Sequence, residues 1–140
     1  MDFVERVLAW NRAAGNTEGE FNPRQAALYV GLILEEVAEM LEEFRGDIYV
    51  RQLAERFKRG EFDEAMAESD RAHLADAGCD IAVVAVGLLM SLGADVQGAL
   101  REVCDSNDSK LVDGRLLKDG NGKVIKPAGY RQPNLEGFLS

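Results

Sequence analysis

Three glutamates, Glu35, Glu36 and Glu39, lie within one apolar stretch of the sequence. Residues three and four apart are neighbours on a helix, so Glu39 would lie beside both of the others. No Lys, Arg or His stands between Arg24 and Arg45 to relieve the repulsion among these carboxylates. Because a buried, unpaired carboxylate is costly, the cluster either faces water or holds a cation that the sequence does not encode.

A second acidic pair, Asp76 and Asp80, precedes another apolar stretch, in which no Lys or Arg occurs from residue 72 to 100. The two residues are four apart and share a helix face. If this face meets the glutamates in a bundle, the product is a cage of carboxylate oxygens. Such ligands select Mg²⁺, with Mn²⁺ as a substitute. The expected chemistry is metal-assisted attack of water on a phosphoryl group, with a spare carboxylate as general base.

Other metals fit the sequence less well. His73 is the only histidine, and the two cysteines lack zinc-ligand spacing. A di-iron bundle needs Glu-x-x-His on two helices, and the chain has neither copy. The turn that begins at Asp119 resembles a calcium loop, but Lys123 occupies a ligand position.

The apolar periodicity and the capping residues predict an all-α helical bundle of about four to five helices with a short C-terminal hairpin or loop tail. The polar third helix is interpreted as a connection or edge element, and the uncharged run from Ile81 to Ala94 as a buried core helix too short to span a membrane. A turn at 119–122 would join two short extended pieces. Helices are expected over residues 3–14, 23–44, 47–59, 71–92 and 96–110, with a further turn or two over 62–67.

Length and charge predict one domain over residues 1–140, with a helical core to residue 109 and a basic tail from 110. Residues 1–109 hold 10 Lys+Arg and 22 Asp+Glu, whereas residues 110–140 hold 6 and 3. The overall charge of −9 argues against a nucleic-acid partner. Two cysteines are too few for a disulfide framework, so a reduced, cytoplasmic setting is expected, without a membrane partner.

The ordered motifs resemble the all-α NTP pyrophosphohydrolases, the MazG-like and dUTPase-like group. Glu35 to Glu39 matches the family's EExxE. Where the family usually has ExxD, Asp80 matches the Asp, Ala77 stands at the Glu position, and Asp76 lies one residue earlier. Residues 102–110 are similar to EVxxxNxSK, and residues 122–130 are similar to GKxxKPxGY. The resemblance covers roughly residues 26–134 with gaps.

The resemblance implies a Mg²⁺-dependent enzyme that cleaves a nucleoside triphosphate between its α- and β-phosphates and releases pyrophosphate. Glu35 and Glu36 would be catalytic, with Glu36 favoured as the base. The substrate class would be dUTP-like or non-canonical (d)NTPs, a house-cleaning role in nucleotide metabolism. The implied metal ligands are Glu35, Glu36, Glu39, Asp76 and Asp80, and the implied substrate contacts are Asn107, Lys110, Lys123, Lys126 and Tyr130.

Two alternatives stay open. Within the same class, the substrate would be phosphoribosyl-ATP. Outside it, the chain would be a helical module that binds a divalent ion or a partner protein without catalysis. The apolar surface of residues 81–92 exceeds what a small monomer needs, so a homodimer, or alternatively a tetramer, is expected.

Overall fold

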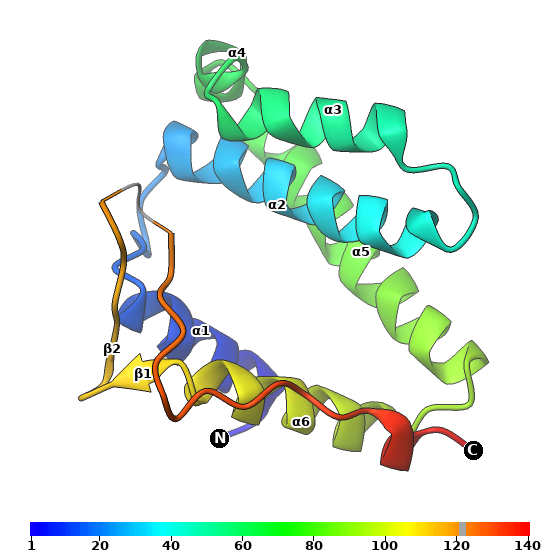
Figure 1. The fold of residues 1–140 in the computed structure, drawn as a ribbon. Helices are drawn as coiled ribbons and strands as arrows, with labels where there is room; N and C mark the ends of the chain where they lie inside the picture. The colour runs from blue at the N-terminus through cyan, green and yellow to red at the C-terminus, as the bar shows by residue number, and fades with distance from the viewer. Residues whose placement is uncertain (121–122) are drawn as a thin grey trace. The chain divides into compact units, whose positions relative to one another are not determined.

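The chain is mostly helical, which confirms the all-α prediction (Figure 1). The computed structural model describes residues 1–120 and 123–140. In these ranges the chain forms six α-helices, one two-stranded sheet and a 3₁₀ turn. The elements are α1 (Phe3–Ala13), α2 (Pro23–Glu42), α3 (Ile48–Lys58), α4 (Asp63–Ala67), α5 (Arg71–Ser91), α6 (Val96–Asp108), β1 (Leu111–Val112), β2 (Arg115–Leu116) and η1 (Glu136–Phe138).

Short polar side chains fix where three of the helices begin. Asp2 accepts a hydrogen bond from the backbone N–H of Glu5, whose carboxylate accepts one from the N–H of Asp2. Asn22 caps α2 directly before a proline at the first helical position, and Asp95 caps α6. These caps satisfy amide donors that have no partner within the helix. The predicted starts of these helices are therefore confirmed.

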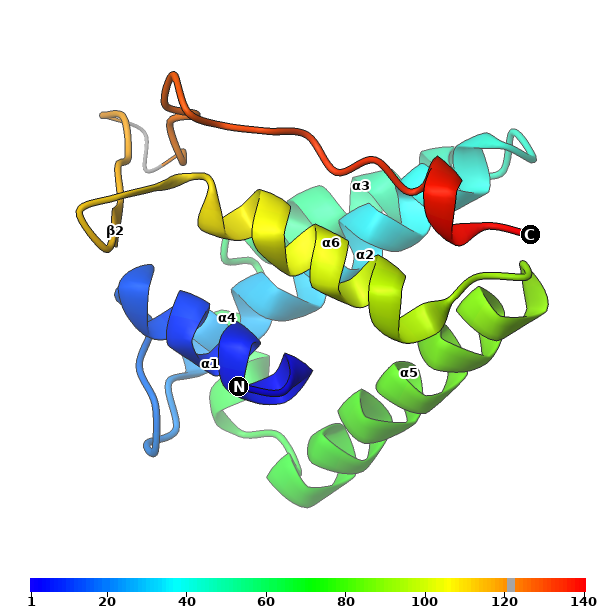
Figure 2. The same cartoon turned by 90° about the horizontal axis from the view of Figure 1, so that it is seen from below.

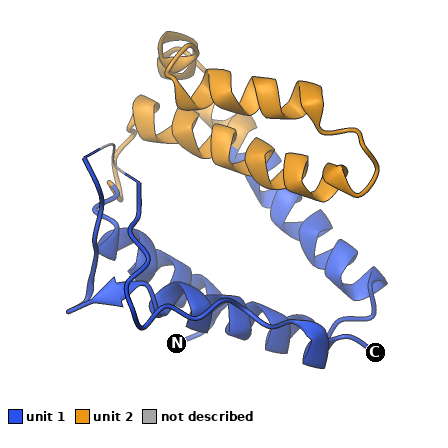
Figure 3. Cartoon of the chain, viewed as in Figure 1, with its two compact units in different colours: residues 1–16, 75–140 blue, residues 17–74 orange. Residues whose placement is uncertain are grey.

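The chain divides into two compact units (Figure 3). Unit 1 comprises residues 1–16 and 75–140, and unit 2 comprises residues 17–74. The residue at which one unit gives way to the other lies inside α5. The tail from residue 110 belongs to unit 1 together with α1 and α6.

Unit 2 is built around a close contact between α2 and α3 (Figure 1). The contact is lined by small buried residues, Ala27, Gly31 and Ala38 on α2 and Ala54 on α3. This third helix, interpreted from the sequence as a connection or edge element, is the main packing partner of α2 within unit 2. The helix is mostly polar, and its one buried residue, Ala54, packs beside Gly31 of α2. Small residues contribute little to an apolar periodicity, so the sequence pattern did not indicate this contact.

Gly31→Ala should destabilise unit 2 by about 1–3 kcal/mol, which is the usual cost of overpacking. A methyl group at this position would lie 2.8 Å from Cγ of Lys58 and 3.0 Å from the carbonyl oxygen of Ala54. The clash outweighs the gain of about 1 kcal/mol that alanine brings to a helix interior. Urea denaturation measures the change. Gly78→Ala is the matched control because nothing lies within 4 Å of its added carbon; a Gly31→Ala protein as stable as this control would contradict the packing.

Unit 1 joins α1 to α6, whose hydrogen-bonded residues are 97 to 102 positions apart in sequence (Figure 2). Arg6 donates to the carboxylates of Asp105 and Asp108, each at 2.7 Å. Trp10 donates its indole N–H to the backbone carbonyl of Asn107 at 3.2 Å. These contacts fasten the first helix along the C-terminal half of α6, which is where the predicted substrate contacts begin.

The tail after α6 first forms a small sheet that the sequence analysis missed. Leu111 pairs with Leu116 and Val112 with Arg115, across a turn at Asp113 and Gly114. Both turn residues have positive φ, 51° and 75°, which is the conformation of a type I′ hairpin. The Asp-Gly pair is the sequence signal for this turn.

The hairpin that was predicted further along is present as a single bridge. Lys118 faces Val124, and the backbone N–H of Asp119 donates to the carbonyl of Lys123. The predicted turn spans residues 119–122, and its last two residues lie outside the described part of the chain. The tail then runs back alongside α6 (Figures 1 and 2).

The tail ends at the start of α6. The backbone N–H of Asp95 donates to the carbonyl of Phe138, and that of Ser140 donates to the carbonyl of Gly93. The ring of Phe138 lies against Gly98, where an added methyl carbon would be only 2.6 Å from it. The last residues of the tail are therefore hydrogen-bonded to the residues directly before α6, so that residues 93–140 form a closed loop.

The prediction that α5 is a buried core helix is wrong. None of its residues is buried, although it has the length and apolar composition of a membrane-crossing helix. Within unit 1 the helix that packs on α6 is α1, and among the described residues of this unit α5 has no comparably close helix partner. Cys79 on α5 is exposed, whereas Cys104 on α6 is buried and this burial raises the pKa of its thiol.

Candidate functional site

The glutamate cluster lies on the middle turns of α2. Glu35, Glu36 and Glu39 occupy neighbouring positions of one continuous helix, as the spacing predicted. Glu36 and Glu39 are exposed, and Glu35 is half-buried. Two of the three glutamates are therefore exposed within unit 2.

Lys58 supplies a counter-charge that the sequence analysis did not anticipate. Its ammonium donates to Oε1 of Glu35 at 3.0 Å and to Oε1 of Glu55 at 3.4 Å. The hydrogen bond to Glu35 is the main reason that the pKa of Lys58 is raised above its ordinary value. The glutamate cluster was expected either to face water or to hold a cation that the sequence does not encode. The cation beside it is instead a lysine of α3. No local signal reveals it, because Lys58 is 23 residues from its partner.

The second acidic pair lies on the exposed first half of α5. Asp76 and Asp80 are both exposed and belong to unit 1, whereas the three glutamates belong to unit 2. Among residues 1–120 and 123–140, no group of three or more His, Cys, Asp or Glu is gathered closely enough to hold a metal ion. The donor chemistry of both sets is that of a hard cation, and the predicted metal site stays a prediction.

Four of the predicted substrate contacts come together at the end of α6. This tail cluster consists of Asn107, Lys110, Lys126 and Tyr130. The ammonium of Lys110 lies 3.3 Å from Oδ1 of Asn107 and 5.7 Å from the centre of the Tyr130 ring. The ammonium of Lys126 lies 5.0 Å from the centre of the same ring. The tail therefore brings two lysines that are 16 residues apart to one aromatic ring.

The tail cluster is electrostatically open to an anion. Within the described residues, neither Lys110 nor Lys126 pairs with a carboxylate. Two ammonium groups beside one ring repel each other, and a bound phosphate would relieve that repulsion. Lys123, the remaining predicted contact, is exposed, and its backbone N–H donates to Oδ1 of Asp119.

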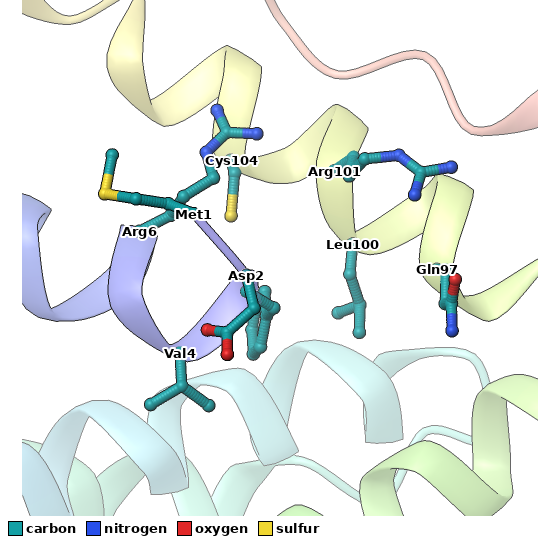
Figure 4. A pocket seen from close by; sticks show the side chains of 9 residues that line it. Met1, Asp2, Val4, Arg6, Gln97, Leu100, Arg101 and Cys104 are labelled. Atoms are coloured by element: carbon teal, nitrogen blue, oxygen red, sulfur yellow. The ribbon is translucent and has the colours of Figure 1, made fainter.

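A separate cavity of about 480 Å³ opens between the first turn of α1 and residues 97–104 of α6 (Figure 4). Figure 4 shows Leu100 and Cys104 on one wall and Asp2 and Val4 on the other. None of its lining residues belongs to the predicted site. Two of its charged residues are already engaged, since Arg6 is held by two aspartates and Asp2 caps a helix, and Arg101 is a third charged residue of the lining.

The comparisons with known proteins contribute no relative. No family model, no curated protein and no solved structure matches the chain.

Proposed function

We propose that the protein is a Mg²⁺-dependent nucleoside triphosphate pyrophosphohydrolase. The observation that carries the proposal is the tail cluster, in which Lys110 and Lys126 flank Tyr130 and neither pairs with a carboxylate of residues 1–120 or 123–140. A triphosphate is the common small ligand whose charge such a cluster would balance. The resemblance of the motifs described above to the all-α NTP pyrophosphohydrolases supports the same function.

The residues divide into two roles. Lys110, Lys126 and Tyr130 bind the phosphates, and Asn107 orients the ammonium of Lys110 through its amide oxygen. Glu36 accepts the proton of the attacking water. The water oxygen forms a bond to a phosphorus of the α–β anhydride, the bridging P–O bond breaks, and pyrophosphate and the nucleoside monophosphate leave.

The carboxylates are the groups that would hold the metal. Glu35, Glu36, Glu39 and Asp80, with Asp76 as a further ligand, offer only oxygen donors. When bound, Mg²⁺ supplies charge neutralisation at the phosphates and lowers the pKa of water. Lys58 competes with it for Glu35, so metal binding requires that Lys58 give up its hydrogen bond.

Pyrophosphate release from a panel of canonical and modified NTPs and dNTPs, with Mg²⁺ and with EDTA, tests the proposal. Release from one or a few substrates that stops with EDTA is expected, with the monophosphate as co-product. Turnover of phosphoribosyl-ATP alone would favour the alternative substrate of the same class. No product from any of them, with a melting temperature that still rises with Mg²⁺, would instead indicate a metal-binding module.

We also propose that the protein is a homodimer. In this dimer, the second copy of the chain covers the apolar helix α5. The apolar side chains of α5 are exposed over its whole length. A helix that is apolar all round is stable in water only when it is covered. A reduced, cytoplasmic setting suits such an enzyme because nucleoside triphosphates are intracellular metabolites.

A further inference from the structure

Arg131 is the most heavily engaged residue of the tail. Both terminal nitrogens of its guanidinium donate to the carboxylate of Glu102 on α6. Its backbone carbonyl accepts a hydrogen bond of 2.7 Å from the hydroxyl of Ser106, and its backbone N–H donates to the hydroxyl of Ser109 at 2.9 Å. The side chain and both backbone groups of this one residue are therefore held by α6.

The three partners of Arg131 are set on one stripe of α6. Glu102, Ser106 and Ser109 are four and three residues apart, so they lie on the same helix face. Ser106 is only 2% exposed, although its side chain is polar. Glu102 accepts one further hydrogen bond, of 2.9 Å, from the backbone N–H of Asn134. The stripe thus fixes the tail at two points, residues 131 and 134.

The residue that this stripe fixes adjoins the tail cluster. Tyr130 directly precedes Arg131, and its backbone N–H closes a turn onto the carbonyl of Pro127 at 2.9 Å. Lys126 directly precedes that turn. The turn at residues 127–130 therefore lies directly before the fixed Arg131. It places Tyr130 and Lys126 near Lys110 at the end of α6.

We propose that Glu102, Ser106 and Ser109 form with Arg131 a latch that sets the position of Lys126 and Tyr130 for the triphosphate. The latch residues are positioning residues, because the contacts of the latch are with the tail and not with the ligand. The effect on substrate rests on the proposed function, whereas the latch itself does not.

The electrostatics keep the latch closed at neutral pH. The hydrogen bonds from Arg131 lower the pKa of Glu102 the most, and the hydrogen bond from the backbone N–H of Asn134 lowers it further. The carboxylate is therefore fully ionised at neutral pH, as the bidentate contact with Arg131 requires. Opening the latch would release Lys126 and Tyr130 into a flexible chain, and a ligand would then have to order them on binding.

Trypsin tests the latch without substrate. Trypsin cleaves after arginine, and the held Arg131 side chain resists its active site. Glu102→Gln should speed cleavage after Arg131 by about fivefold relative to cleavage after Lys123, which corresponds to losing an exposed charge pair. Glu68→Gln, an exposed glutamate of unit 2, is the matched control. An unchanged ratio of the two cleavages in Glu102→Gln would overturn the latch.

Steady-state kinetics on the active substrate test whether the latch positions Lys126 and Tyr130 for substrate binding. Glu102→Gln and Arg131→Gln should each raise KM by about fivefold with kcat changed less than about twofold, because the lost positioning affects substrate binding. The double variant should be no worse than either single variant, since both remove the same contact. Additive increases in KM, or an equal loss of kcat, would overturn the positioning role. If the wild-type chain turns over no substrate, the proposed function fails, and the trypsin ratio still decides the latch.

Discussion

Glu36→Gln is expected to reduce Mg²⁺-dependent pyrophosphate release by at least about 100-fold, the usual effect of removing a general base. The amide cannot take the proton of the attacking water, although it has nearly the same size. Glu36 is exposed on α2, so the substitution leaves the packing of α2 on α3 intact. Removing one of three adjacent negative charges also relieves repulsion within the helix. The measurement is kcat on the best substrate of the panel, with urea denaturation to verify the fold.

Asp80→Asn extends the test to the second acidic pair. We expect a similar loss of turnover and, in addition, a smaller rise of melting temperature with Mg²⁺, because one anionic oxygen ligand is lost. Glu64→Gln, an exposed glutamate on α4 outside the predicted site, should leave both quantities unchanged. Full activity in Glu36→Gln or Asp80→Asn would remove that residue from the site.

Val84→Glu is expected to convert a dimer into a monomer. Val84 lies in the middle of α5 and is 67% exposed in the single chain, so a glutamate is tolerated there before association. A carboxylate buried against the apolar face of a second copy would cost several kcal/mol. The dissociation constant should therefore rise by at least about 100-fold, as measured by sedimentation or light scattering at micromolar concentration. Tyr49→Glu is the matched control, since Tyr49 on α3 is 84% exposed.

The proposed dimer would cover the exposed apolar side chains of α5. Seven apolar side chains of α5 are exposed, from 36% for Leu74 to 70% for Met90, and Leu92 directly after the helix is 60% exposed. Covering each half-exposed side chain contributes about 1 kcal/mol, so two copies together gain on the order of 15 kcal/mol. Association costs about 4–15 kcal/mol, and the gain offsets this cost.

Other occupants of this helix would give different results. A bilayer is disfavoured because Asp76 and Asp80 would have to enter it. Flotation of the wild-type chain with lipid vesicles would nevertheless support a membrane. A wild-type monomer whose α5 amides resist hydrogen exchange would mean that the chain itself covers the helix. Either result, or a Val84→Glu protein that remains dimeric, would contradict the interface.

Local chemistry explains what the sequence made predictable. Asp2, Asn22 and Asp95 act on amides within three residues, so their helices begin where these side chains predict. The carboxylate spacing on α2 and α5 follows from the helical repeat alone. The gathering of Lys110, Lys126 and Tyr130 came from the motif resemblance, since no local rule brings the tail back to α6.

Contacts between distant residues explain what was missed. The pairing of Lys58 with Glu35 depends on how closely two helices approach, which Gly31 permits and the residue pattern does not reveal. Arg131 belongs to none of the motifs described in the sequence. It is nevertheless held by Glu102, Ser106 and Ser109, to which no role was assigned from the sequence. Hydropathy alone assigned α5 to a core, because it measures how apolar a helix is and not what covers it.

The return of the chain to the start of α6 limits how far the tail can move. Backbone hydrogen bonds hold Phe138 to Asp95 and Ser140 to Gly93, on the far side of the latch from the tail cluster. If Arg131 lets go of Glu102, this second anchor keeps the freed segment tethered at a high effective concentration near its helix. Reclosing is then an intramolecular loop closure, which takes on the order of 10–100 ns for a short loop. Opening would therefore be brief and local, and Lys126 would return to the end of α6 without a search through solution.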